Sequence, residues 1–290
     1  MMPLDLDALD ILLSADDENR IDFETNYKFY SKYFQSLEPS YTWVFNTDLS
    51  LNAKIASTES IMKINQIYWG DVFQSISAAE QVFYRRAHTL LTSSYSALTS
   101  NDFLSSAILT RSLLEVCMWN VYHSAIFENC VKGINKNPQK FILGSPEMQD
   151  SLLKLMWGSN EKHVIDEVKQ HKVYKIFDKV AKATKQSNLV NVDIEKTYDA
   201  LSEFVHPNTE GNNVFIAWDI NGYEKPTTEV NLDISFVQND DKRNKPSKAI
   251  LQALNWCVPS IIFSSQKYTN VRKKLIAKFK LNNKKHLKIH

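Results

Sequence analysis

The stretch Phe103–Phe127, FLSSAILTRSLLEVCMWNVYHSAIF, decides the predicted fold. On a helix with about 100° of rotation per residue, its apolar side chains reach almost all the way round. Arg111 and Glu115 interrupt them, one turn apart on a single face. A charged pair amid so much hydrocarbon argues against a lipid-facing span, because charge in lipid is costly. The stretch therefore predicts the buried central helix (about 103–127) of a mainly helical bundle, whose charges find partners inside the protein.

The composition of the 290 residues also favours long helices. Glycine occurs 6 times and proline 8 times, which is too few for the many turns of an all-β protein. The formal net charge of +1 excludes a chain-wide field that would select nucleic acid or membrane. No run of about 20 uncharged apolar residues predicts a membrane span.

The cysteines and the first residues bear on the compartment. Three cysteines stand far apart without a Cys-x-x-Cys motif, a pattern typical of a reducing compartment. Met1–Asp10 is acidic and lacks the basic region of a signal peptide. We therefore expect a cytoplasmic protein.

Charge is concentrated near the two ends of the sequence. Residues 1–22 are mostly acidic, and lysines dominate the last stretch. We expect a single helical domain over 1–290, with the acidic segment 1–22 and a basic tail 281–290 peripheral to it. The basic pattern fits nucleic acid, an acidic partner or the chain's own acidic end. The predicted binding residues are Lys273, Lys274 and Lys278. The alternative is that both ends are simply solvated.

Capping and turn signals divide the remaining sequence into helices. Asp193 and Ser247 are expected N-caps, and breaks or kinks are expected at Gly70-Asp71 and near Pro259. Besides 103–127, the expected helices are 4–13, 23–37, 58–68, 72–98, 147–157, 162–184, 194–205 and 247–280.

One segment has the period of a strand. Val230, Leu232, Ile234 and Phe236 alternate with polar residues, and Asn221-Gly222 upstream is a strong type I′ turn signal. We expect a small antiparallel β-hairpin at about 214–236, with one face buried. Pro226 in this segment predicts a bulge or a longer loop.

The stretch YDALSEFVHPN, residues 198–208, holds the polar residues most suited to chemistry. Tyr198, Ser202 and His206 follow one another at i+4 spacing on the shoulder of an apolar helix face. The helix end favours protonated His206, whereas burial near Arg111 would oppose it.

Two interpretations of these residues remain open. In the structural interpretation, Arg111, Glu115, Tyr198, Ser202 and His206 form a buried polar network that fixes the register of two helices. In the functional interpretation, Arg111 binds an anion such as phosphate and His206 transfers protons, while the other side chains orient them. Both predict that Arg111 and Glu115 are mostly buried and that Arg111 bonds beyond its own helix.

Other catalytic and cofactor motifs are absent from the sequence. There is no P-loop, dinucleotide-binding, zinc-protease or nucleophile-elbow motif. His163 and His171 have no third ligand in register, so we expect no metal and no cofactor.

The motifs Arg-Ser-Leu-Leu-Glu at 111–115 and Tyr-x-x-x-Ser-x-x-x-His-Pro at 198–207 carry a resemblance. Together they resemble a family of uncharacterised bacterial all-helical proteins, distantly similar to the HEPN superfamily of helical nucleases and toxin or defence components. The match is confined to residues 101–208. HEPN ribonucleases carry an arginine and a histidine a few residues apart on one helix, whereas Arg111 and His206 stand on separate helices here.

The resemblance implies a bacterial toxin or antiphage-defence protein that acts on RNA or a nucleotide. It would be a metal-independent ribonuclease or nucleotide-acting enzyme. Arg111 and His206 would be its catalytic residues, supported by Glu115, Tyr198 and Ser202. The alternative is a non-catalytic interaction subunit that binds a protein partner or forms a homo-oligomer.

Overall fold

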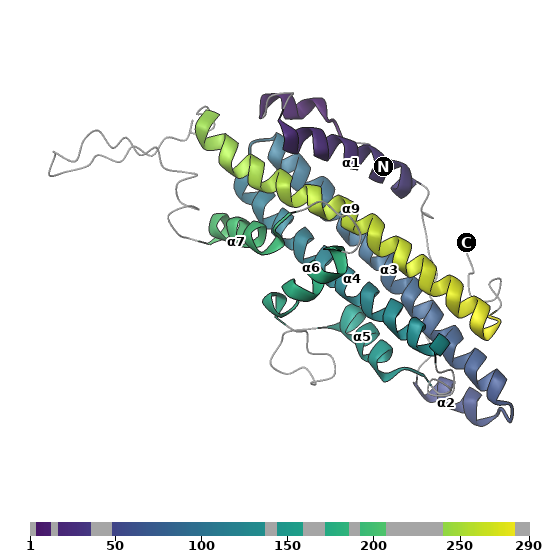
Figure 1. Cartoon of the computed structure of the whole chain (residues 1–290). Coiled ribbons are helices and arrows are strands. Elements are labelled where there is room, and N and C mark those ends of the chain that lie inside the picture. The colour runs from purple at the N-terminus through teal and green to yellow at the C-terminus, as the bar shows by residue number, and fades with distance from the viewer. Residues whose placement is uncertain are drawn as a thin grey trace, which may run out of the picture. The chain divides into compact units, whose positions relative to one another are not determined.

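The computed structural model describes residues 4–12, 17–35, 48–136, 144–158, 172–185, 192–206 and 240–281 (Figure 1). Almost all of those residues are helical. The helices are η1 (Asp7–Ile11), α1 (Glu18–Gln35), α2 (Asp48–Ala56), α3 (Ile61–Thr99), α4 (Phe103–Lys136), α5 (Pro146–Trp157), η4 (Val173–Lys175), α6 (Phe177–Lys185), α7 (Ile194–Val205) and α9 (Asp240–Phe279).

The predicted fold class is right in its helices and wrong in its hairpin. No β-strand occurs among the residues just given, so the mixed fold is corrected to an all-helical one. The hairpin segment itself, 214–236, lies outside the described residues. The alternation of apolar and polar residues predicts which side chains would share a face. It does not predict a second layer of structure that would bury this face. A lone two-stranded hairpin is marginal in water for this reason.

The helix predicted at 194–205 is confirmed together with its N-cap. Asp193 accepts a hydrogen bond from the backbone N–H of Lys196 and begins α7 where the sequence placed it. The helix predicted at 147–157 and its end at Gly158 are confirmed too, whereas its N-cap, Ser145, and the Pro146 of its first turn were not predicted.

At both places where a break or kink was predicted, the helix is not broken, because packing outweighs local propensity. α3 runs unbroken through Gly70, which is buried beside the fully buried Trp69. A glycine inside a helix costs only about 1 kcal/mol, less than burying one large side chain contributes. α9 likewise continues through Pro246 and Pro259, and buried neighbours such as Trp256 offset the hydrogen bond lost at a proline.

The predicted helix 162–184 is also wrong in its described part. The structure there has the short helix η4, a turn at Ile176 and then α6. The central helix predicted at 103–127 is helical throughout, and the observed helix, α4, continues to Lys136.

The chain divides into two compact units, each treated by itself below. Unit 1 consists of Met1–Lys32, Ala87–Val116 and Asn188–Pro259, and unit 2 consists of Tyr33–Arg86, Cys117–Ser187 and Ser260–His290. α3, α4 and α9 each contribute one part to each unit. The expectation of one domain stays a prediction.

In unit 1, α1 packs along α9 and α3 (Figure 1). Phe23 of α1 is fully buried and stacks on Tyr95 of α3, with ring centroids 5.6 Å apart. The side chain of Asn255 in α9 donates a hydrogen bond of 2.7 Å to the carbonyl of Asn19. The aromatic residues that the sequence shows in α1 therefore form core contacts.

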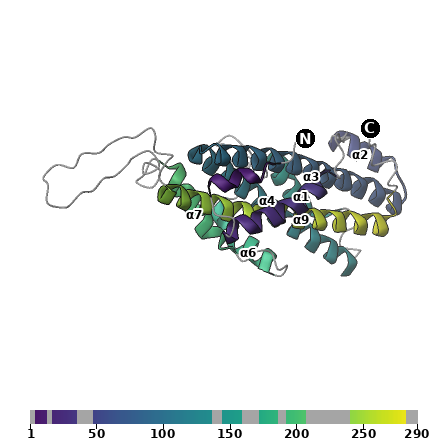
Figure 2. The ribbon, with the colours of Figure 1, turned by 90° about the horizontal axis from the view of Figure 1, so that it is seen from above.

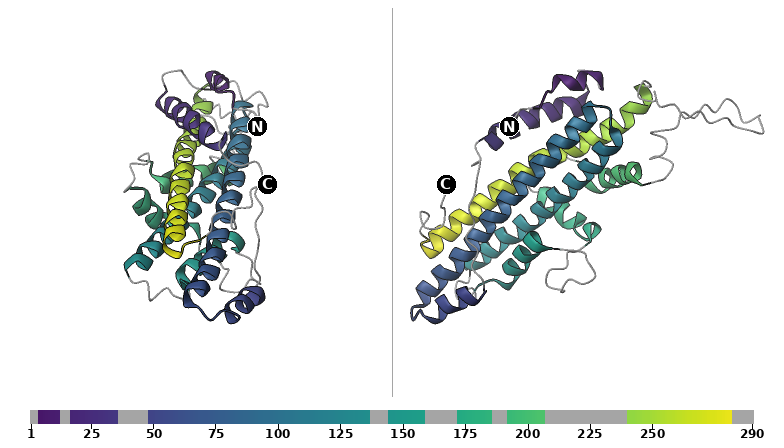
Figure 3. Two further views of the ribbon diagram at one scale, coloured as in Figure 1. Left: turned by 90° about the vertical axis from the view of Figure 1, so that its right-hand side faces the viewer. Right: turned by 180° about the vertical axis from the view of Figure 1, so that it is seen from behind.

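In unit 2, the C-terminal part of α9 lies along α3 and α4 (Figures 2 and 3). Trp69 of α3 stacks on Phe279 of α9 at 4.9 Å, and Phe127 of α4 contacts Tyr268 at 5.9 Å. α5 covers the same core with Met148, which is fully buried. None of the described helices is both long and apolar enough to cross a membrane.

Candidate functional site

Arg111, Glu115 and Tyr198 come together in unit 1, where α7 packs against α4. Tyr198 Oη accepts a hydrogen bond of 2.7 Å from Arg111 Nη2 and donates one of 2.9 Å to Glu115 Oε1. Arg111 Nη2 and Glu115 Oε1 themselves are 3.8 Å apart. The tyrosine hydroxyl therefore relays the interaction between the two charged groups. The prediction that Arg111 bonds beyond its own helix is confirmed.

The predicted burial of the charged pair is wrong. The Arg111 side chain is 26% exposed and that of Glu115 is 34% exposed, so both are half-buried. The helix is apolar almost all round, but its charged face lies at the edge of unit 1 and does not enter the core. The Arg111 guanidinium carbon also lies 4.8 Å from the centroid of the Tyr198 ring, a cation–π contact.

The environment changes the acidity of Tyr198. Burial raises the pKa of its phenol; the hydrogen bond from Arg111 opposes this rise, and the neighbouring Glu115 adds to it. The phenol therefore keeps its proton at neutral pH and donates it to the carboxylate. In this state Tyr198 orients both charged groups and does not itself act as a base.

Ser202 and His206 take no part in this contact. The Ser202 hydroxyl donates to the Tyr198 carbonyl of its own helix at 2.8 Å. His206 is exposed and is the C-cap of α7, where the backbone leaves helical geometry with ψ of 148°. The i+4 spacing places residues on one face only within a helix. Because α7 ends at Val205, the spacing does not place His206 on that face.

The predicted basic residues lie on the last turns of α9 in unit 2. Lys273 and Lys278 are exposed, and Lys274 is half-buried. Residues 282–290 of the basic tail lie outside the described residues.

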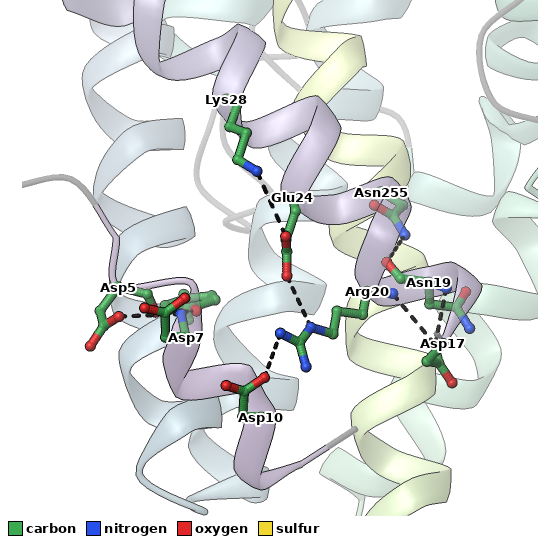
Figure 4. Close-up of polar contacts among 10 residues, drawn as sticks. Asp5, Asp7, Asp10, Asp17, Asn19, Arg20, Glu24, Lys28 and Asn255 are labelled. Carbon is green, nitrogen blue, oxygen red and sulfur yellow. Dashed lines mark hydrogen bonds and ion pairs between the residues drawn. The ribbon is translucent and has the colours of Figure 1, made fainter. Parts of the chain in front are cut away.

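A cluster around Arg20 was not predicted (Figure 4). Arg20 is buried and forms ion pairs with Asp10 at 2.6 Å and with Glu24 at 2.9 Å. Asp17 caps α1 and pairs with Lys248 of α9 at 3.5 Å. The signal was present in the sequence, because Arg20 is the one basic residue within the acidic stretch before Lys28.

A second missed group is the buried ion pair of unit 2. Arg272 Nη1 of α9 lies 2.5 Å from Glu80 Oε2 of α3, and the Glu80 side chain is only 3% exposed. Burial raises the pKa of Glu80 to about 7, although Arg272 and hydrogen bonds from Ser265 and Tyr84 oppose this rise. The two residues are 192 positions apart, so no local pattern could have indicated their contact.

Within the described ranges, no three His, Cys, Asp or Glu side chains are grouped so as to hold a metal ion. His163 and His171 lie outside those ranges. Comparison of the chain with protein-family models, curated proteins and solved structures finds no match. The HEPN resemblance therefore stays a prediction from the two short motifs.

Proposed function

We propose that this chain acts on RNA or a nucleotide and binds a phosphate group of that ligand at Arg111. One observation carries the proposal: the Arg111 guanidinium is oriented by its hydrogen bond to Tyr198 but remains 26% exposed. Its carboxylate neighbour is 3.8 Å away, which is long for a charge-assisted hydrogen bond. An oriented arginine with donors to spare suits bidentate binding of phosphate.

His206 supplies the second group that phosphodiester chemistry requires. In RNA cleavage without a metal, the 2′-hydroxyl attacks phosphorus and the bond from phosphorus to the 5′-oxygen breaks. A base takes the hydroxyl proton, the leaving 5′-oxygen receives a proton from that group or from water, and a cation stabilises the charge that develops. The imidazole of His206 is exposed, and a neutral imidazole nitrogen can take that proton. Arg111 would stabilise charge on the phosphate oxygens, while Tyr198 and Glu115 position Arg111. The toxin or phage-defence type rests on the motifs at 111–115 and 198–207 alone.

The test is an assay of RNA cleavage and nucleotide modification by the purified full chain. We expect activity in the wild type, loss of activity in His206→Ala, and weaker phosphate binding in Arg111→Lys. Lysine keeps the charge but cannot make the bidentate contact. Lys196→Ala is the matched control, because this α7 side chain is 86% exposed and lies outside the cluster. Equal activity in the wild type and His206→Ala would remove His206 from the mechanism.

A non-catalytic interaction subunit is the second candidate, and a specific observation favours it. The Tyr198 hydroxyl both accepts and donates a hydrogen bond, and Ser202 is satisfied within its own helix. Such a closed set of bonds serves to fix the register of α4 and α7. An inactive wild type whose thermal stability falls in Tyr198→Phe would support this candidate over the enzyme.

A further inference from the structure

A group of lysines surrounds one glutamate in unit 2. Glu128 of α4 accepts a hydrogen bond of 2.6 Å from Lys267 Nζ of α9. Lys132, one turn further along α4, lies 3.6 Å from the same carboxylate and is 54% exposed. Burial raises the pKa of Glu128, but Lys267, Lys132 and Lys274 together lower it below its ordinary value. Glu128 is therefore a carboxylate enclosed by ammonium groups from two helices.

The helical register extends this group along α9. At about 100° per residue, Lys267, Lys274 and Lys278 fall within about 40° of one another on the helix surface. Lys273 points about 100° away from Lys274 and is exposed. We call Lys132, Lys267, Lys274 and Lys278, with Glu128 among them, the lysine face. It has four ammonium groups and one carboxylate, so it is strongly positive in a chain that is nearly neutral overall.

We propose that the lysine face binds the phosphate backbone of RNA. Lys267 and Lys278 are 11 positions apart, or about 16 Å at 1.5 Å per residue, so the lysines of α9 extend well beyond the size of one phosphate group. A single phosphate would need only one of these positions, whereas a linear polyanion can contact them all. Lysines are point charges without the fork of arginine, so the contacts are independent of base sequence.

Glu128 has a definite part in this arrangement. In the free protein it forms ion pairs with Lys267 and Lys132, and these ion pairs must break when the two lysines bind phosphates. Its negative charge also repels the backbone. Glu128 therefore limits the affinity of the lysine face, and this predicts opposite effects for mutations of the two charge types. The choice of RNA as the polyanion rests on the proposed function.

The test measures binding of a labelled single-stranded RNA of about 20 nucleotides to the full chain over a series of salt concentrations. Each lysine lost from the face should lower the log–log salt slope by about 0.7 and weaken binding several-fold at low salt. Lys132→Ala/Lys274→Ala should show this loss twice. Lys273→Ala should weaken binding less than Lys274→Ala, because its side chain points away. Lys182→Ala on α6, also an exposed lysine of unit 2, is the matched control.

The direction in which Glu128→Gln changes RNA affinity is the decisive result. The neutral side chain should tighten RNA binding about threefold, because the repulsion is removed and Lys267 is released. Unchanged binding in the double lysine variant, or weaker binding in Glu128→Gln with an unchanged melting temperature, would overturn the proposal. Polyglutamate or phosphatidylserine vesicles that displace RNA at equal charge concentration would also overturn it.

The two proposals fail separately. Loss of cleavage in His206→Ala with unchanged RNA binding in the lysine variants would leave the proposed function standing and remove the lysine face. If the chain has no catalytic activity but its RNA binding depends on salt and weakens in the lysine variants, the lysine face stands and the proposed function fails.

Discussion

Each unit of this protein contains an arginine and a glutamate in contact, and the two pairs have opposite surroundings. In unit 2, Arg272 and Glu80 are 2.5 Å apart and the carboxylate is 3% exposed. In unit 1, Arg111 and Glu115 are 3.8 Å apart, both half-exposed, and joined through the hydroxyl of Tyr198. The same two residue types therefore make a closed internal contact in one place and an open surface contact in the other.

This difference shows that burial decides what an Arg–Glu pair contributes. Breaking a buried pair is strongly destabilising, because each charge has lost its water and depends on its partner. A half-exposed pair contributes little to stability but keeps hydrogen-bonding capacity for a ligand. We therefore expect stability to depend on the pair of unit 2 and any ligand to bind at the pair of unit 1.

The largest effect is expected for Arg272→Ala. Well above pH 7, where Glu80 is ionised, removal of the arginine leaves a buried charge without its partner, which should lower the free energy of unfolding by about 3–5 kcal/mol. Denaturant titration of the purified variant measures this change. A loss below about 1 kcal/mol would show that the pair of unit 2 matters no more for stability than the pair of unit 1. The proposed difference between the two pairs would then be wrong.

The pH dependence of stability should follow Glu80. The folded protein raises its pKa from 4.5 to about 7, so the folded state binds the proton more tightly than the unfolded state. Stability from this group is therefore complete below about pH 4.5 and declines as pH rises to about 7, by about 1.4 kcal/mol per pH unit at most. Unfolding of Glu80→Gln at several pH values should lack this decline. A slope that persists in Glu80→Gln would assign it to another group.

The pair of unit 1 should give a smaller change. Because Arg111 and Glu115 are half-exposed, Arg111→Ala should cost about 1 kcal/mol rather than the 3–5 kcal/mol of a buried pair. Tyr198→Phe should cost a similar amount, because it removes both hydrogen bonds of the hydroxyl. The double variant should cost less than the sum of the two. Additive losses would mean that Tyr198 does not connect the two helices through Arg111.

The smallest change is expected for His206→Ala. The side chain is exposed at the end of α7, so unfolding should change by less than about 0.5 kcal/mol. Thermal melting beside the wild type checks this expectation and shows whether the variant is suitable for the activity assay. A larger loss would indicate that His206 supports the fold.

The sequence was sufficient for features that depend on near neighbours. Asp193 caps α7 as predicted, because the backbone group that it binds is three residues away. It failed where distant packing decides, as at Gly70, where burial in the core outweighs the glycine penalty. For the site, helical arithmetic brought Arg111 to Tyr198 but misplaced His206, because that arithmetic ends where α7 ends. The pair of Glu80 and Arg272 has no local signal at all.

The bond between Asn19 and Asn255 has a consequence for synthesis. The two residues are 236 positions apart, and both belong to unit 1. At about 5–20 residues per second, the ribosome needs roughly 10–50 s to make the second after the first. During that time the part of α9 that α1 packs against does not yet exist, although Tyr95 of α3 can already cover Phe23. Unit 1 can therefore complete its core only late in translation, after residues 240–259 of α9 have been made.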